Sequence, residues 1–337
     1  MLSAFITALS GLELTEREAA VLRAAKPAGV ILFARNARDP LQLRKLIDAA
    51  VAAIGTEDVL VLVDQEGGRV QRLKPPHWRR LPSGAAYAQA YAQDPASACR
   101  AASLAAQLTA MDLRAVGINT NCAPVLDLPT PGSHQIIGDR AYGIDPAQVV
   151  ALARAVAEGH LAGGVLPVVK HVPGHGRAAA DSHLELPVVT ATREDLEATD
   201  FEPFRRLANL PAAMTAHVVF SAFDADQPAS TSPGIVKNVI RGAIGFDGLL
   251  ISDDLGMKAL TGSIAERALA VLTAGSDLAL LCSGDSTETE SVASVAPALV
   301  GASRQRFERA CAVFGQQRPF DVAEAEAGLA DILRAGA

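Results

Sequence analysis

The stretch LPVVKHVPGHGRAAADSHLELP, residues 166–187, contains the pattern that decides the fold. A short, Val-rich apolar run over residues 165–169, bounded by Gly and Pro, predicts a buried strand. Lys170 and His171 follow at once, where such a strand would leave its sheet. Enzymes commonly carry their reactive groups on loops at the carboxyl ends of strands. We therefore interpret this stretch as part of an active site.

The same pattern of an apolar strand followed at once by charged residues recurs along the chain. Val59–Val63 ends in Asp64, and Gly248–Ser252 ends in Asp253. Apolar segments that alternate with helical patterns are predicted at residues 4–10, 29–33, 59–63, 118–122, 166–170, 212–216, 248–252 and 278–281. Their number and order match a (β/α)8 TIM barrel in the α/β class. An open doubly wound sheet is the competing architecture, but no G-x-G-x-x-G fingerprint follows the first strand.

Helical patterns connect these segments. Thr15 with Glu18 three residues later forms a capping-box signature at the start of the first helix. Helices are predicted at residues 15–25, 40–54, 96–116, 146–162, 193–207, 232–240, 264–274, 291–314 and 321–335. No linker rich in Pro, Ser or Gly divides the 337 residues. We therefore predict a single domain over residues 1–337, with C-terminal helices from about 290 to 335 packed on the barrel.

Composition excludes several classes of protein. The net charge of −7 and the isoelectric point near 5.5 disfavour nucleic acid or an anionic membrane as a partner. The four cysteines are scattered without a C-x-x-C pair, which disfavours a disulfide scaffold or a zinc ribbon. The N-terminal segment lacks a basic region, and no apolar run is long enough to span a bilayer. Composition therefore leads us to expect a soluble cytoplasmic protein.

Several reactive residues would meet at the mouth of such a barrel. They are the strand-end residues Asp64, Lys170, His171, His217 and Asp253. Each has a plainer interpretation on its own, since a strand-end Asp can cap a turn and a Lys–His pair can belong to a salt-bridged rim. Convergence from several strands favours function over these interpretations.

Zinc binding is one chemistry that this set allows. His171, His175 and His183 would be the imidazole ligands, with Asp181 or Asp253 as the carboxylate. The spacing of His171 and His175 suits one face of a helix. The Pro and Gly residues around them disfavour a helix there.

Two further interpretations involve a sugar. In the first, Asp253 attacks a sugar carbon while His183, oriented by Asp181, gives and takes the proton. An Asp–His pair suits this task, because the carboxylate fixes the tautomer of the imidazole and raises its basicity. In the second, the protein binds a sugar without cleaving it, and then it needs no acid–base pair.

At this point the sequence resembles glycoside hydrolase family 3, in particular its bacterial single-domain β-N-acetylhexosaminidases of peptidoglycan recycling. The resembling stretches are DQEGGRVQR at 64–72, GDRAYG at 138–143, KHVPGHG at 170–176, DSH at 181–183 and SDDLGM at 252–257. They occur in the family's order and spacing along nearly the whole chain.

The resemblance implies a role for each matching residue. Asp253 would be the nucleophile, and His183, paired with Asp181, the general acid/base. The ring of N-acetylglucosamine would be bound by Asp64, Arg72, Arg140, Lys170 and His171. The implied activity is a retaining exo-β-N-acetylglucosaminidase that acts on N-acetylglucosaminyl-1,6-anhydro-N-acetylmuramic acid and its peptides. On this resemblance we expect a monomer that acts on a small-molecule substrate without a cofactor or a metal. A substrate-assisted mechanism, a retaining phosphorylase and a metal-dependent TIM-barrel hydrolase remain open as alternatives.

Overall fold

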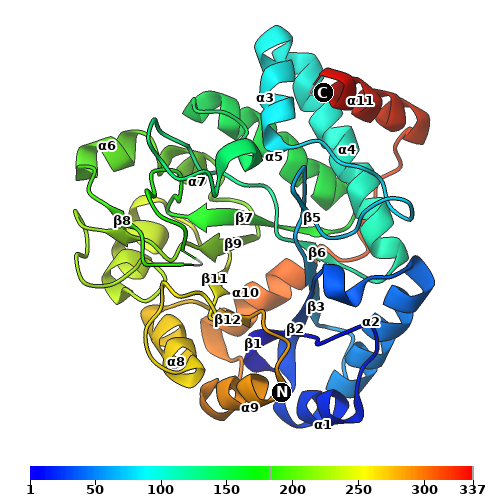
Figure 1. Ribbon diagram of the computed structural model, residues 1–337, viewed down its shortest axis with the longest axis vertical. Helices are drawn as coiled ribbons and strands as arrows, with labels where there is room; N and C mark the ends of the chain where they lie inside the picture. Colours follow the sequence, from blue (N-terminus) through cyan, green and yellow to red (C-terminus); the bar gives the residue numbers. More distant parts are fainter. Residues whose placement is uncertain (183, 336–337) are drawn as a thin grey trace.

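A computed structural model describes residues 1–182 and 184–335 of the chain. Within these residues, eight parallel strands close into a barrel, as the sequence predicted, and helices surround it (Figure 1). In the order of neighbours, the strands are β1 (Ser3–Ala8), β12 (Leu278–Leu281), β11 (Leu249–Asp254), β9 (Ala212–Thr215), β7 (Leu166–Val172), β6 (Thr120–Asn121), β3 (Leu60–Val63) and β2 (Pro27–Leu32). Hydrogen bonding of β1 to both β2 and β12 closes the barrel.

The strands are apolar on both faces because the barrel is packed inside and covered outside. In β3, Leu60 and Leu62 belong to the cluster that fills the barrel interior. Val61 and Val63 belong to the outer cluster, with Leu46 of the helix α2 (Pro40–Ile54). Side chains of a strand alternate between its two faces, so every second residue points toward the barrel axis.

The surrounding helices begin and end at local signals. In α1 (Glu16–Ala25), the hydroxyl of Thr15 accepts the N–H of Glu18 at 3.2 Å, and the Glu18 carboxylate accepts the N–H of Thr15 at 2.9 Å. The predicted capping box is thus present. The remaining helices are α3 (Gly84–Gln93), α4 (Pro95–Ala115), α5 (Pro146–Ala162), α6 (Arg193–Ala198), α7 (Glu202–Arg206), the π-helix η3 (Ile235–Ala243), α8 (Ile264–Ala274), α9 (Ser286–Val295), α10 (Gly301–Cys311) and α11 (Val322–Ala335).

Shorter elements lie in the connections. They are the 3-10 turns η1 (Ala34–Asn36) and η2 (Gly138–Arg140), the hairpin of β4 (Gln65–Gly67) with β5 (Val70–Gln71), and the pair β8 (Val188–Val189) and β10 (Val219–Phe220). The hairpin directly follows β3, so the residues after Asp64 stay at the mouth of the barrel.

Three helix predictions were wrong in detail. Between the predicted strand at 59–63 and the predicted helix at 96–116, where no helix was predicted, the structure contains the helix α3. The single helix predicted over 193–207 is divided into α6 and α7, because the buried Asp200 carboxylate binds Arg177 and the Thr199 hydroxyl. The helix predicted over 291–314 is divided into α9 and α10, because Pro297 and Leu299 form main-chain hydrogen bonds with the segment around β1.

The C-terminal helices occupy two places on the barrel. Phe307 and Ala310 of α10 pack onto the interior cluster at the amino-terminal ends of the strands. In Figure 1, α11 lies beside α3 and α4. None of the described helices is long and apolar enough to cross a lipid bilayer.

Candidate active site

A cavity of about 390 Å³ opens at the carboxyl ends of the barrel strands. Its walls come from β2, β7, β9, β11 and β12 and from the segments that follow β2, β3, β6, β7, β11 and β12. The lining residues are Ile31, Phe33, Asp64, Glu66, Arg69, Val70, Arg72, Ile136, Ile137, Arg140, Lys170, His171, His175, Ser182, Met214, Asp253, Asp254, Met257, Leu280 and Cys282. Acidic, basic and imidazole groups thus share one enclosed space, which is the usual composition of an active site.

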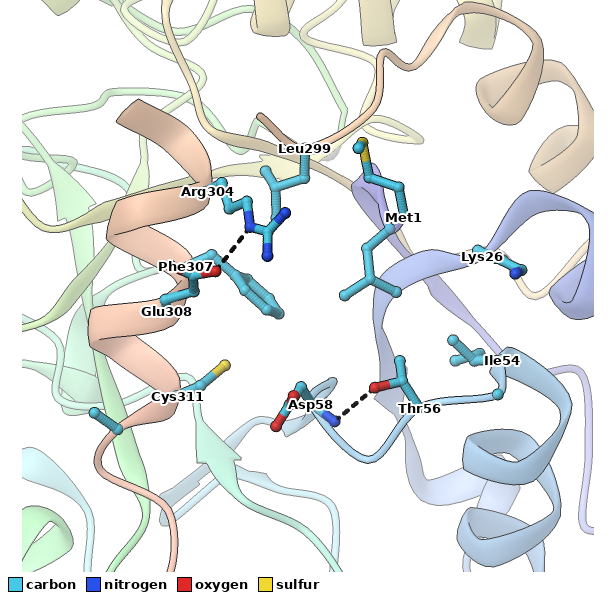
Figure 2. Close-up of a pocket in the computed structure, with 13 residues that line it drawn as sticks. Met1, Lys26, Ile54, Thr56, Asp58, Leu299, Arg304, Phe307, Glu308 and Cys311 are labelled. Atoms are coloured by element: carbon cyan, nitrogen blue, oxygen red, sulfur yellow. Dashed lines mark hydrogen bonds and ion pairs between the residues drawn. The ribbon is translucent and has the colours of Figure 1, made fainter. Parts of the chain in front are cut away.

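Another cavity, of about 490 Å³, lies at the opposite end of the barrel (Figure 2). Its residues precede β1, β2 and β3 or belong to α10 and the segment before it. Met1, Leu299 and Phe307 line it, and its charged groups include the ion pair of Arg304 with Glu308. No histidine of the described part of the chain lines it. Because conserved chemistry in such barrels sits at the carboxyl ends of the strands, we place the active site in the first cavity.

Strand alternation explains why three charged residues meet in the first cavity. In β3, β7 and β11, the residues two and four positions before the charged one face the barrel interior. These interior residues are Leu60 and Leu62, Leu166 and Val168, and Leu249 and Ile251. The next residues on the same face are Asp64, Lys170 and Asp253. All three side chains therefore emerge from the core along the barrel axis.

A network of opposite charges forms one wall of the cavity. The Lys170 ammonium lies 2.8 Å from Asp64 and 2.6 Å from Glu66. Arg72 donates to Asp64 at 3.0 Å, and Arg140 donates to both oxygens of Glu66 at 2.8 and 2.7 Å. The side chains of Lys170 and Glu66 are only 3% and 6% exposed, so water screens their pairing little.

This network keeps its members ionised. Burial would raise the pKa of Asp64 and of Glu66, but the charge of Lys170, with Arg72 or Arg140, lowers both pKa values below their usual range. Burial would lower the pKa of Lys170, but the two carboxylates raise it. The wall therefore presents fixed charged donors and acceptors, which bind hydroxyl groups more strongly than neutral groups do.

A second network holds the two histidines of the 170–176 segment. Asp127 is fully buried, and its Oδ1 accepts hydrogen bonds from the main-chain N–H groups of His171 at 3.1 Å and His175 at 2.7 Å. Its Oδ2 lies 2.6 Å from the ring nitrogen Nδ1 of His171. Burial would raise the pKa of Asp127, but His171 and these hydrogen bonds lower it to about 2. An ionised carboxylate accepts only, so His171 Nδ1 carries a proton. Within the described residues, no three His, Cys, Asp or Glu side chains are grouped to hold a metal ion.

Asp253 lies at the end of β11 and is 7% exposed. Burial would raise its pKa, but the charges of His171 and His217, and then the N–H of Asp254, lower it. His217 is buried, with Nδ1 2.7 Å from the Ser230 hydroxyl and Nε2 3.0 Å from the Asp254 carbonyl oxygen. The adjacent carboxylate of Asp254 accepts main-chain N–H groups, including that of Cys282. Burial raises the pKa of Asp254, so Asp253 is the more readily ionised carboxyl group of the pair.

Most of the predicted site residues meet in this cavity. Asp64, Arg72, Arg140, Lys170, His171 and Asp253 all line it. Ser182 represents the predicted 181–183 motif among the lining residues. Asp181 is half-buried, and its carbonyl oxygen accepts the N–H of Leu184 at 2.9 Å. His183, the predicted acid/base, lies outside the described residues.

The sequence interpretation assigned no role to Glu66 or Asp127, which the structure places in the two networks. A signal was present for both. Glu66 follows Asp64 by two residues, and Asp127 ends the apolar run 122–126 just as Asp64 and Asp253 end theirs. Their partners Arg140 and His171 are 74 and 44 residues away in the chain, so the pairing itself could not be seen.

The family model described as glycosyl hydrolase family 3 N terminal domain matches residues 4–312. The chain belongs to glycosyl hydrolase family 3. Its relatives include a β-hexosaminidase of Alkalilimnicola ehrlichii, 44% identical over 286 residues that cover 84% of this chain and 81% of the relative. Another is a β-hexosaminidase of Bordetella avium, 41% identical over 278 residues that cover 81% and 79% of the two chains.

Solved structures agree with this assignment. The crystal structure of NagZ from Neisseria gonorrhoeae in complex with N-trifluoroacetyl-D-glucosamine is similar to this chain with a TM-score of 0.87 and 31% identity, over 100% and 98% of the two chains. A family 3 β-N-acetylglucosaminidase from Paenibacillus sp. str. FPU-7 has a TM-score of 0.85 and 29% identity, over 99% and 67% of the chains. This family 3 glycoside hydrolase thus shares its barrel with sugar-cleaving enzymes over its whole length.

Replacement of Asp127 by Asn tests the second network. The Asn side chain keeps the size of Asp but places an NH2 donor where Asp127 accepts, which favours the tautomer of His171 that is protonated at Nε2. We expect kcat/KM for an aryl glycoside to fall about 10²-fold. Nitrogen NMR of labelled protein should show the changed tautomer. The exposed Asp48→Asn is the control, and an unchanged His171 spectrum in Asp127→Asn would contradict the prediction.

Proposed function

We propose that this glycoside hydrolase is a retaining exo-β-N-acetylglucosaminidase. Its substrates are peptidoglycan fragments in the cytoplasm, N-acetylglucosaminyl-1,6-anhydro-N-acetylmuramic acid and its peptide-bearing forms. The observation that carries the proposal is the ionised Asp253 carboxylate on the barrel axis, in one cavity with the Asp64–Lys170–Glu66 wall. The β-hexosaminidase names of relatives that are 44% and 41% identical support the choice of sugar.

The proposed reaction has two steps. Asp253 attacks the anomeric carbon and forms a glycosyl ester, while the glycosidic bond breaks and His183 donates its proton to the leaving oxygen. Water then attacks the ester, His183 accepts the proton of the water, and Asp253 is released as a carboxylate. Asp181 holds the imidazole of His183 in this proposal. The lowered pKa of Asp253 suits the nucleophile, which must stay ionised.

Charged residues in the wall of the cavity bind the sugar in this proposal. We propose that Asp64, Arg72, Arg140, Lys170 and His171 bind the hydroxyl and acetamido groups of the N-acetylglucosamine ring. Each of the four charged side chains is already held by a partner in the network, so little reorganisation is needed when the sugar enters. Glu66 then acts as the shared anchor of Lys170 and Arg140.

Product analysis with 4-nitrophenyl glycosides tests the function. The proposal expects release of N-acetylglucosamine with retained β-configuration, much faster than release of glucose from the matched glucoside, and no effect of a chelator. Peptidoglycan disaccharides should be cleaved from the non-reducing end. Phosphate-dependent formation of N-acetylglucosamine 1-phosphate would identify a phosphorylase instead. Binding of the sugar without release of nitrophenol would identify a sugar-binding protein.

The covalent step has its own test. A fluorinated sugar that slows the second step should leave a mass increment on the peptide that contains Asp253. Absence of this adduct in an active enzyme, together with formation of an oxazoline product, would point to attack by the acetamido group of the substrate.

A further inference from the structure

The buried side chain of His175 contacts the segment that carries Asp181 and Ser182. The proposed mechanism gives His175 no role. The residue is 3% exposed, and its main-chain N–H donates a hydrogen bond to the Asp127 carboxylate at 2.7 Å. Its ring nitrogen Nε2 lies 3.3 Å from the Ser182 hydroxyl. Its other ring nitrogen, Nδ1, is buried and has no hydrogen-bond partner among the described residues. Among the residues that the structure describes, Ser182 is therefore the hydrogen-bond partner of this ring.

Ser182 connects two segments of the cavity wall. Its hydroxyl lies 3.6 Å from the sulfur of Met257, and its carbonyl oxygen accepts the N–H of Ala259 at 3.2 Å. Met257 and Ala259 belong to the segment that follows Asp253 at the end of β11. Ser182 is 2% exposed, so these contacts form in an almost dry environment. The segment of the proposed nucleophile and the segment of the proposed acid/base are thus joined at this residue.

The protons of this contact can be assigned. Burial and the neighbouring His171 lower the pKa of His175 to about 4, so the ring is neutral at pH 7 with a proton on one nitrogen. If the Ser182 hydroxyl donates to the Met257 sulfur, His175 Nε2 donates to Ser182 and Nδ1 keeps its lone pair. The opposite tautomer would bury an unpaired N–H, which costs more than an unused lone pair. His175 is therefore a donor that fixes the Ser182 hydroxyl.

We propose that Ser182, held by His175 and Met257, is a positioning residue that sets the placement of the acid/base segment relative to Asp253. The inference rests on the proposed function, in which Asp253 is the nucleophile and His183 the acid/base. Ser182 does not touch reacting atoms in this account. It acts because its side chain and its carbonyl oxygen connect the chain at Asp181 and Ser182 to the loop after β11.

Ser182→Ala in the full chain tests the inference by the dependence on the leaving group. An acid that is displaced harms poor leaving groups most, because activated ones depart without protonation. We expect kcat/KM, which reports only the first step, to fall about 10- to 100-fold for an alkyl β-N-acetylglucosaminide and less than about 3-fold for the 2,4-dinitrophenyl glycoside. The control is Ser276→Ala, since Ser276 is also buried and its hydroxyl has no partner among the described residues.

A pair of His175 variants gives a second test, which also serves if Ser182→Ala does not fold. His175→Gln keeps an N–H donor near the position of Nε2, whereas His175→Leu removes it. We expect His175→Leu to show the selective loss on the alkyl glycoside and His175→Gln to recover most of it. Equal losses on both substrates, or no recovery by Gln, would overturn the inference.

Failure of the inference can be told apart from failure of the proposed function. His183→Ala should show the same selective loss of activity on the alkyl glycoside. Asp253→Asn should lose activity on both substrates. If these two variants behave as expected while Ser182→Ala and His175→Leu show no selectivity, the positioning role is wrong and the function stands. If His183→Ala loses activity on both substrates equally, the assignment of His183 as the acid is itself wrong.

Discussion

Asp253→Asn is expected to lower kcat/KM for 4-nitrophenyl N-acetyl-β-glucosaminide about 10⁴-fold, because the amide cannot form the glycosyl ester. The replacement is nearly isosteric, and the N–H of Asp254 that now donates to Asp253 still finds an oxygen acceptor. The fold should therefore persist, as thermal unfolding will check. Mass spectrometry of the variant with a fluorinated sugar should show no covalent adduct.

The neighbouring carboxylate provides a matched control. Asp254 accepts the main-chain N–H groups of Gly256 and Cys282, and Asn at this position can still accept through its amide oxygen. We expect Asp254→Asn to lose less than about tenfold in kcat/KM. If Asp254→Asn is the more damaging change, or if Asp253→Asn keeps a tenth of the activity, the nucleophile has been assigned to the wrong residue.

Lys170→Met is expected to have the largest effect on stability. The variant leaves Asp64 and Glu66 buried together without the cation that lies between them. Removal of one partner from a buried ion network typically costs about 3–5 kcal/mol of unfolding free energy. Denaturant unfolding at pH 7 will measure the loss, with the exposed Lys237→Met as control. Glycosidase activity should fall as well, since Lys170 lines the cavity.

The stability loss should depend on pH in a defined direction. In the native protein, the pKa values of Asp64 and Glu66 are lowered, so their contribution to stability is present above the pKa of the unfolded chain and is lost as pH falls through the folded values. Without Lys170, only Arg72 and Arg140 oppose the effect of burial, so both pKa values rise toward those of the unfolded chain. The difference between the variant and the native protein should then be largest near pH 7 and shrink below about pH 5. A difference that does not change with pH would contradict this explanation.

Local signals were sufficient to predict much of the fold. The helices α2, α5 and α8 have the predicted bounds, and α2 shows why. Asp39 accepts the N–H of Gln42, Pro40 occupies the first turn, and Gly55 ends the helix at a φ of 85°. The division of the predicted helix 291–314 had no such signal beyond one proline. It depends on main-chain hydrogen bonds to a strand almost three hundred residues earlier.

In the site, too, local signals predicted one part and long-range contacts decided the rest. Strand-end position was enough to predict that Asp64, Lys170, His171 and Asp253 meet, because the carboxyl ends of parallel strands share one face of a barrel. The hydrogen-bond and ion-pair partners of these residues could not be predicted from the sequence. Asp127 follows a two-residue strand and an irregular segment, so its orientation toward His171 depends on the path of the loop and not on a period in the sequence.

The two-residue alternation of β3, β7 and β11 also restricts how this enzyme can evolve. Insertion of one residue between Leu166 and Lys170 would turn the ammonium outward among the helices and send a helix-facing valine into the barrel centre. A single insertion would thus damage chemistry and core together, and no later point mutation could restore both. Changes in length should accumulate in the loops beyond the strand ends, which makes these loops the part of the molecule in which new aglycone preferences can arise.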